Sequence, residues 1–220
     1  MFKKILSYLY PITIYNKPSV ISKSIEVTLY NGKMLLNTKN TNYSYGSLQV
    51  ILKKGLLDIG KAEINSMESI LILGVAGGSV VQTLVSDFSF AKNITGVEVD
   101  KEIIDVANSY FNLDKISNFK CIIADAEQFV KTDANHYDLI VIDIFKDTEM
   151  PAFLFEKSFI SNCKKLLNKN GYILFNTMHL TADSKNTFDK YLLHFDSNSY
   201  FKKVLKNIER YNDVIIIRRI

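Results

Sequence analysis

Mostly apolar runs and segments with helical spacing alternate through the middle of the chain. The runs lie at residues 70–73, 94–100, 119–123, 137–142 and 171–176. Unbroken Ile, Leu and Val runs are typical of strands that are covered on both faces. Helical spacing follows the first four runs, at residues 80–86, 101–111, 126–131 and 152–167. The alternation predicts an α/β protein with a parallel, doubly wound sheet and helices on both faces.

The N-terminal part of the chain has a different pattern. Residues 25–30 and 33–38 flank Asn31-Gly32, a dipeptide that favours a type I′ β-hairpin. A small β appendage is therefore predicted over residues 12–40. Residues 44–60 have helical spacing, and Gly60 is a plausible end for that helix.

The C-terminal part predicts the edge of the same sheet. Residues 181–195 have the pattern of a helix, and residues 201–208 and 213–217 have the pattern of an antiparallel strand pair. With the five central strands, this pair makes a seven-stranded, mostly parallel sheet. We expect an N-terminal segment with a hairpin over residues 1–43 and one larger domain over residues 44–220.

A glycine-rich turn follows the first central strand. It contains Gly74, Gly77 and Gly78, and Ser79 opens the next helix. Glycines let backbone N–H groups approach a nucleoside or phosphate at the N-terminus of a helix. Because the turn lacks the full Gly-x-Gly-x-x-Gly pattern, a turn that only tightens packing between strand and helix remains an alternative.

Three successive strands end in acidic residues. These are Glu98, Asp125 and Asp143, and the carboxyl ends of parallel strands are where open α/β sheets bind ligands. Glu98 lies 24 residues after Gly74, close to the spacing of about 20 expected for a carboxylate that holds a ribose. The alternative is structural, with Asp125 capping the following helix and Asp143 capping the following turn.

Taken in order, these motifs resemble a known family. Ile-Leu-Gly-x-x-Gly-Gly-Ser, Val-Glu-Val-Asp, Ala-Asp-Ala, Tyr-Asp-Leu-Ile-Val-Ile-Asp and Leu-Leu-Asn-Lys-Asn-Gly-Tyr-Ile-Leu-Phe-Asn resemble the spermidine synthase-like branch of the class I S-adenosylmethionine-dependent methyltransferases. The resemblance covers residues 27–176 and implies a Rossmann-like fold. It also implies a cofactor, S-adenosylmethionine or its decarboxylated form.

The resemblance assigns roles to individual residues. The turn residues Gly74, Gly77, Gly78 and Ser79 would hold the methionine-like part of the cofactor. Glu98 would hold the ribose, Asp125 would meet the adenine amino group, and Ala126 would offer a backbone N–H.

The implied reaction is displacement at a carbon attached to a sulfonium. The protein then has to align the acceptor and remove a proton, and Asp143 is the candidate for that task. The family's acceptor is a polyamine, and Tyr45 and Asp147 are candidate acceptor contacts, although a tyrosine beside a helix start is also common at the edge of a core.

Several carboxylates of the polyamine enzymes are missing from this chain. Residues 42–46 read Asn-Tyr-Ser-Tyr-Gly where those enzymes carry Tyr-His-Glu, Gly77 replaces an acid of the glycine turn, and Asp147 comes one residue late after Asp143. A doubly charged amine would lose partners, so methyl transfer is at least as well supported as aminopropyl transfer. A catalytically silent module that binds a nucleoside or forms a dimer is the second hypothesis. A Rossmann dehydrogenase, the third, is disfavoured by the glycine pattern and by Asp125.

Composition limits the classes of partner and the location that we expect for this protein. The net charge of +4 comes from scattered lysines, so no nucleic-acid or membrane partner is expected, and a homodimer is compatible with the N-terminal hairpin. The two cysteines show no disulfide or metal-ligand spacing, so no metal is predicted. A cytoplasmic location is expected, because cysteines without a disulfide pattern fit a reducing compartment. No apolar run approaches the 18 or more residues of a membrane span.

Overall fold

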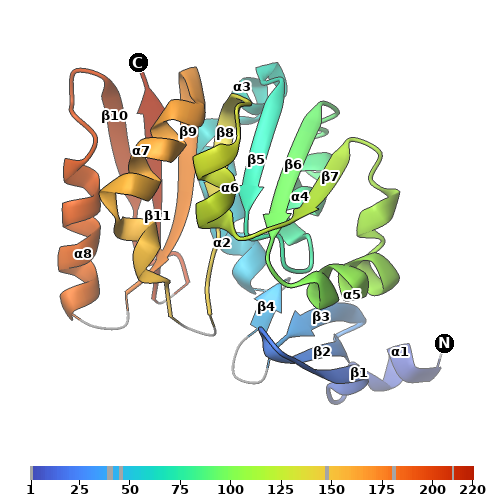
Figure 1. Ribbon diagram of the computed structural model, residues 1–220. Helices are drawn as coiled ribbons and strands as arrows, with labels where there is room; N and C mark the ends of the chain where they lie inside the picture. The colour runs from blue at the N-terminus through green and yellow to red at the C-terminus, as the bar shows by residue number, and fades with distance from the viewer. Residues whose placement is uncertain (1, 39–41, 45–46, 147–148, 180–181, 210) are drawn as a thin grey trace.

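A seven-stranded sheet forms the centre of the protein. The computed structural model describes residues 2–38, 42–44, 47–146, 149–179, 182–209 and 211–220. In spatial order the strands are β10, β11, β9, β8, β5, β6 and β7 (Figure 1). Within this sheet, β11 runs opposite to the other six strands, which are parallel to one another. The predicted Rossmann-like methyltransferase fold is confirmed. The strand bounds are β5 Ser69–Leu73, β6 Asn93–Glu98, β7 Phe119–Ile123, β8 Tyr137–Ile142, β9 Leu167–Met178, β10 Tyr200–Leu205 and β11 Asn212–Arg219.

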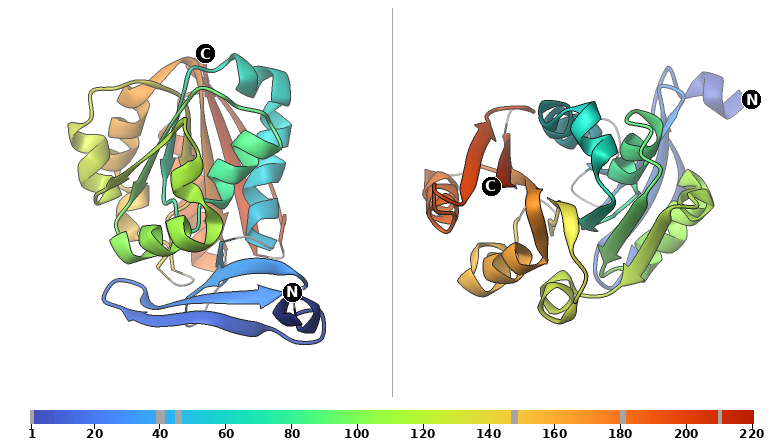
Figure 2. Two further views of the ribbon diagram at one scale, coloured as in Figure 1. Left: turned by 90° about the vertical axis from the view of Figure 1, so that its right-hand side faces the viewer. Right: turned by 90° about the horizontal axis from the view of Figure 1, so that it is seen from above.

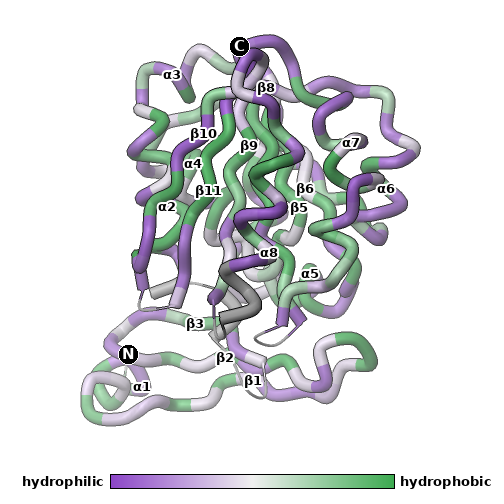
Figure 3. Tube along the Cα trace, turned by 90° about the vertical axis from the view of Figure 1, so that its left-hand side faces the viewer, coloured by the Kyte–Doolittle hydropathy of each residue, from purple (hydrophilic) through white to green (hydrophobic). Residues whose placement is uncertain are grey.

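Helices cover both faces of this sheet, and each face has its own apolar core (Figure 2). One core takes side chains from α2 (Ser47–Ile59), α3 (Lys61–Ser66), α4 (Ser79–Ser86) and α5 (Lys101–Phe111). The opposite core takes side chains from α6 (Ala126–Thr132), α7 (Lys157–Leu166) and α8 (Ala182–Leu193). Figure 3 shows the consequence, with hydrophobic strands inside and hydrophilic positions on the outer helices. Among the described residues, no helix has the length and apolar character needed to cross a membrane.

A second, smaller sheet lies at the carboxyl ends of the central strands (Figure 1). It is preceded by α1 (Phe2–Leu6) and contains β1 (Ile12–Ser19), β2 (Lys23–Tyr30), β3 (Lys33–Asn37) and β4 (Asn42–Ser44). The predicted hairpin is confirmed as β2 and β3, because Asn31 and Gly32 adopt the positive φ values of 49° and 73° that a type I′ turn needs. The hairpin belongs to a larger, four-stranded sheet.

The small sheet packs against α5. Ile25, Val27 and Leu36 form one apolar cluster with α5 side chains that include Ile103 and Phe111. This packing holds the small sheet over the edge of the large sheet where the predicted site residues lie.

The helix predicted over residues 152–167 is wrong in its first turn. The segment forms a 3₁₀ helix, η2 (Ala152–Phe155), and α7 starts only after Glu156, whose backbone is extended. The break places the Phe155 ring within 6.1 Å of the rings of Phe175, Phe188 and Tyr191, measured between centroids. Burial of that aromatic ring favours the break over a continuous helix.

Helix α2 lies close to the sheet at a glycine. A Cβ atom on Gly55 would be 2.5 Å from Cδ1 of Leu174 and 2.9 Å from Cγ1 of Val214, and both of these side chains are fully buried. The glycine therefore sets how closely α2 can approach β9 and β11.

We expect Gly55→Ala to lower the free energy of unfolding by about 1–3 kcal/mol, because the added methyl group overpacks the core. The same change on an exposed helix surface usually stabilises by about 1 kcal/mol. Urea denaturation measures the difference. The exposed α5 position Ser109→Ala is the control and should change the stability by less than about 0.5 kcal/mol. A more stable Gly55→Ala protein would contradict the packing described here.

Candidate active site

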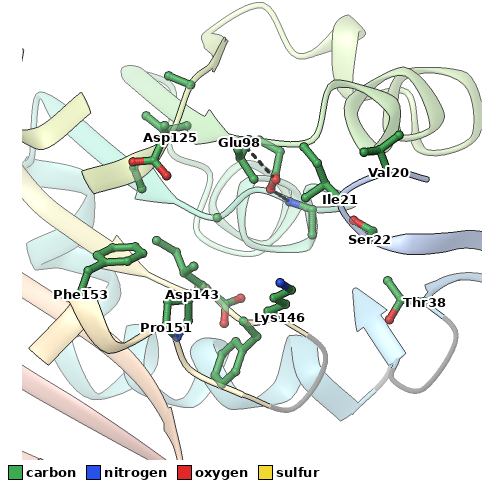
Figure 4. Close-up of a pocket in the computed structure, with 18 of the residues that line it drawn as sticks. Val20, Ile21, Ser22, Thr38, Glu98, Asp125, Asp143, Lys146, Pro151 and Phe153 are labelled. Carbon is green, nitrogen blue, oxygen red and sulfur yellow. Dashed lines mark hydrogen bonds between the residues drawn. The ribbon is translucent and has the colours of Figure 1, made fainter. Parts of the chain in front are cut away.

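A cavity of about 370 Å³ lies between the carboxyl ends of the central strands and the small sheet (Figures 1 and 4). Its size falls within the range of small-molecule sites. Segments that are far apart in the sequence meet there. The lining residues are Val20, Ile21, Ser22, Lys23, Thr38, Gly74, Ala76, Val97, Glu98, Val99, Ala124, Asp125, Ala126, Asp143, Ile144, Phe145, Lys146, Pro151 and Phe153.

The glycine turn reaches the cavity through its first half. Gly74 has a φ of 89°, and a Cβ atom there would lie 2.2 Å from the carbonyl oxygen of Asp143, so only glycine fits. Ala76 also lines the cavity. The predicted residues Gly77, Gly78 and Ser79 are absent from the described lining.

The second half of the turn starts α4. Gly78 adopts a left-handed conformation at the N-cap of α4, and a Cβ atom on it would meet the Leu113 side chain at 2.5 Å. Ser79 is buried, and its carbonyl oxygen accepts a hydrogen bond from Thr83. Gly78 therefore tightens the packing around the turn, which is the alternative that the sequence left open.

Glu98 joins two loops at the end of β6. Its Oε2 accepts hydrogen bonds from the backbone N–H groups of Val75 (3.1 Å) and Ala76 (3.0 Å). Its Oε1 accepts from Val99 (2.9 Å) and Asp100 (3.1 Å). Burial raises the pKa of this carboxyl, and the four backbone donors offset part of the rise. Figure 4 shows the carboxylate at the cavity wall.

Asp125 is exposed at the end of β7 and caps α6. Its Oδ1 accepts a hydrogen bond from the backbone N–H of Gln128 at 3.0 Å. The N-cap alternative for Asp125 is confirmed, and the residue also lines the cavity together with Ala126.

Asp143, at the end of β8, is held by a chain of buried amides. Asn176 donates to its Oδ1 from Nδ2 at 2.9 Å, and Asn212 donates to Oδ1 of Asn176 at 3.0 Å. Burial raises the pKa of the Asp143 carboxyl to about 6; the Asn176 hydrogen bond lowers it, and the negative charge of Glu98 raises it. A carboxyl with such a pKa can take up and release protons near neutral pH.

Asp100, just after the end of β6, attaches the small sheet to the large domain. Oδ2 of Asp100 accepts hydrogen bonds from the hydroxyl groups of Ser19 (2.8 Å) and Ser22 (2.6 Å). Its Oδ1 accepts from the backbone N–H of Glu102 at 2.9 Å and so caps α5. These bonds place the turn between β1 and β2 beside Glu98. Val20 and Ile21, at the tip of this turn, form an apolar wall of the cavity.

Sequence reasoning missed this wall and further lining residues, which include Lys146, Pro151 and Phe153. Asn176 was also missed, although its position as a polar residue ending the fifth strand was a usable signal. Tyr45 and Asp147 lie outside the described residues. Among the described residues, no group of three or more His, Cys, Asp and Glu side chains is placed to hold a metal ion.

A second cavity of about 320 Å³ lies on the other side of β9. Its lining includes His179, Phe188 and Asp213, from β9, α8 and β11 or the loops beside them. His179 therefore does not contribute to the described lining of the first cavity.

Comparison with known proteins agrees with the fold. The human methyltransferase-like protein 13, solved in complex with SAH, superposes with a TM-score of 0.60 at 22% identity over 79% of this chain and 78% of that chain. A spermidine synthase solved with the transition-state analogue AdoDATO superposes with a TM-score of 0.63 at 17% identity over 94% of this chain and 73% of that chain. The fold is thus that of the class I methyltransferases.

The sequence identifies the family within that class. The profile of the spermine/spermidine synthase domain matches residues 49–217, so the chain belongs to this family. A probable polyamine aminopropyl transferase of Bifidobacterium longum is 27% identical over 161 residues. That alignment covers 70% of this chain and 35% of the relative, so the chain spans about a third of the relative's length.

We expect Asp100→Ala to detach the turn between β1 and β2. The variant loses a helix cap and two hydrogen bonds to a carboxylate, which together stabilise by about 2 kcal/mol or more. Hydrogen exchange should accelerate at the amides of Ile21 and Ser22, whose N–H groups are held by the Ser19 hydroxyl. The control is Asp105→Ala on the exposed face of the same helix, which should leave these amides protected. Unchanged exchange in Asp100→Ala would contradict the assigned role.

Proposed function

We propose that the cavity binds S-adenosylmethionine or its decarboxylated form and that the chain is a transferase. It moves a methyl or aminopropyl group to a small acceptor, and a polyamine is the acceptor that the relatives' names suggest. The observation that carries the proposal is the meeting of Glu98, Asp125 and Asp143, from three different strands, around one cavity of suitable size. The solved relatives that bind SAH and a transition-state analogue of this class support the choice of cofactor.

The lining residues fit a nucleoside with a sulfur-linked tail. Val99, Pro151 and Phe153 offer apolar surface for a purine ring, and Asp125 offers a carboxylate in the lining of the same cavity. Gly74 leaves room for a ligand to approach the backbone. Glu98 can accept from ribose hydroxyl groups when they replace one of its backbone donors, since a carboxylate has about four acceptor positions.

Asp143 is the candidate group for proton removal or for orienting the acceptor. The bound sulfonium would supply an activated carbon and a neutral leaving group. Asp143 would then hold the acceptor atom in line and take its proton, and Asn176 keeps one carboxylate oxygen fixed while the other remains available.

One observation favours the second hypothesis, a catalytically silent module of the same fold. All four acceptor positions of Glu98 are occupied by backbone N–H groups. In the dimer-forming version of such a module Glu98 would only shape the loops, and the cavity would take no nucleoside.

Calorimetric titration separates the transferase from a silent module whose cavity takes no nucleoside. Methylthioadenosine, S-adenosylmethionine and decarboxylated S-adenosylmethionine should all bind to the unmodified protein. Glu98→Ala and Asp125→Ala should each weaken binding by about tenfold or more, the loss expected for one or two hydrogen bonds to a charged group. The exposed acid Asp114, which is outside the cavity lining, provides the control Asp114→Ala. Absence of binding by all three nucleosides would leave the silent module.

The pH dependence of transfer should follow Asp143. Because the base must be ionised, the rate should fall as the pH is lowered through about 6. Asn176→Ala removes the hydrogen bond that favours the ionised form, so the acidic limb of the rate profile should move to higher pH. A profile that is flat between pH 5 and 8 would remove Asp143 from the proton step.

The raised pKa of Asp143 also leads to a prediction about stability, which can be tested without an activity assay. The pKa of Asp143 is higher in the folded protein than in an unfolded chain, so the contribution of this carboxyl to stability is present below the unfolded value of 3.8 and is lost as the pH rises through about 6. Asp143→Asn should therefore stabilise the protein more at pH 8 than at pH 4. Thermal melting at the two pH values measures this difference, and an equal change at both would contradict the burial effect.

A further inference from the structure

The charges around the cavity are divided between its two ends. Asp125 and Phe153 lie at one end, whereas Ser22, Thr38 and Lys146 lie at the other (Figure 4). Glu98 and Asp143 lie between them. Figure 4 shows the Lys146 side chain extending into the cavity from the segment after Asp143.

The backbone of Lys146 is fixed. Its N–H donates to the carbonyl oxygen of Glu149 at 2.8 Å, and the N–H of Glu149 donates back to the carbonyl oxygen of Lys146 at 3.1 Å. The side chain is exposed, and within the described parts of the chain its ammonium group has no hydrogen-bond or ion-pair partner. The lysine thus offers the cavity a positive charge that no described carboxylate pairs at salt-bridge distance.

The acids around the middle of the cavity already accept hydrogen bonds from the protein. Glu98 holds four backbone N–H groups, and Asp100 holds two serine hydroxyl groups and a helix N-terminus. Asp143 accepts from Asn176. A ligand ammonium group placed at the Lys146 end would therefore face a cation, and Ser22 and Thr38, which line the same end, carry no carboxylate to compensate it. A ligand carboxylate would meet a charged donor.

We propose that Lys146 binds a carboxylate and thereby makes the cavity selective for a ligand that carries one. This inference rests on the proposed function. The carboxylate belongs either to the amino-acid tail of S-adenosylmethionine or to an acidic acceptor. In the first case Lys146 disfavours the decarboxylated cofactor, which has lost the negative group and keeps its ammonium, and the transferred group is a methyl group.

The test compares ligands that differ only in the tail. Methylthioadenosine lacks the amino-acid group, whereas S-adenosylmethionine and its decarboxylated form differ by the carboxylate. Each is titrated calorimetrically into the unmodified protein and into Lys146→Gln, Lys146→Arg and Lys146→Glu. Lys131→Gln, an exposed lysine on α6 outside the cavity lining, is the matched control.

We expect the unmodified protein to prefer S-adenosylmethionine over the decarboxylated form by about tenfold, the effect of one charge-assisted hydrogen bond. Lys146→Gln should remove most of this preference, Lys146→Glu should reverse it, and Lys146→Arg should keep it. The preference should also shrink at high salt, because an exposed ion pair is screened. Methylthioadenosine should bind all variants equally.

The outcomes separate the two proposals. If methylthioadenosine and both cofactors fail to bind the unmodified protein, the proposed function is overturned, and the carboxylate site with it. If methylthioadenosine binds and the cofactor preference does not depend on Lys146, succinate is titrated into the complex with S-adenosylhomocysteine. Succinate binding that Lys146→Gln abolishes assigns the carboxylate to the acceptor. If neither the cofactor preference nor succinate binding depends on Lys146, the carboxylate site is overturned and the proposed function stands.

Discussion

The ligand-facing edge of this protein depends on the buried carboxylate of Glu98. Loops after parallel strands leave backbone N–H groups without partners in the sheet, and such groups are costly to bury unpaired. Here one side chain accepts from both the loop after β5 and the loop after β6. The two loops are thereby held against each other, and the carboxylate reaches the cavity from between them. A ligand that binds Glu98 must compete with the interactions that shape its own site.

Two further contacts extend this arrangement to the rest of the cavity. On one side, the absence of a side chain at Gly74 lets the β5 turn lie directly against the backbone of Asp143, so β8 delivers its acid next to the turn. On the other side, Asp100 binds the serine hydroxyl groups of the small sheet. Glu98 and Asp100 are separated by one residue, yet the first faces the loops of the large sheet and the second faces the small sheet. The sequence Glu-Val-Asp therefore joins the loops at the carboxyl edge of the large sheet to the turn between β1 and β2.

The large sheet and its helices could be predicted from the sequence, because their apolar runs and helical spacing are local signals. The hairpin was also predictable, since Asn31-Gly32 supplies the two positive φ values. Strand β1 gave a weaker signal because it contains Pro18, which is tolerated at the edge of the small sheet that β1 forms.

The walls of the cavity could not be predicted in the same way. The contact between Ser19 and Asp100 joins residues 81 positions apart, and that between Asn176 and Asp143 joins residues 33 positions apart. No local pattern encodes such pairings. The glycine turn is a different case, because its motif is local and indicates a ligand-binding turn. The motif does not indicate which of its residues face the cavity, as Gly74 and Ala76 do, and which pack inside, as Gly78 does against Leu113.

The surroundings of Asp143 are hard to explain as a contribution to stability. Burying a carboxyl near a second buried acid disfavours its ionised form, and an apolar or amide side chain would avoid that cost. The protein instead compensates the acid with Asn176, and it fixes the amide of Asn176 with the equally buried Asn212. Because Asn212 donates to the amide oxygen of Asn176, the Nδ2 group of Asn176 is left to point at Asp143. Two buried amide side chains thus serve the position and charge of one carboxylate at the cavity wall. Such local conflicts with stability are expected where the chemistry of a site requires them.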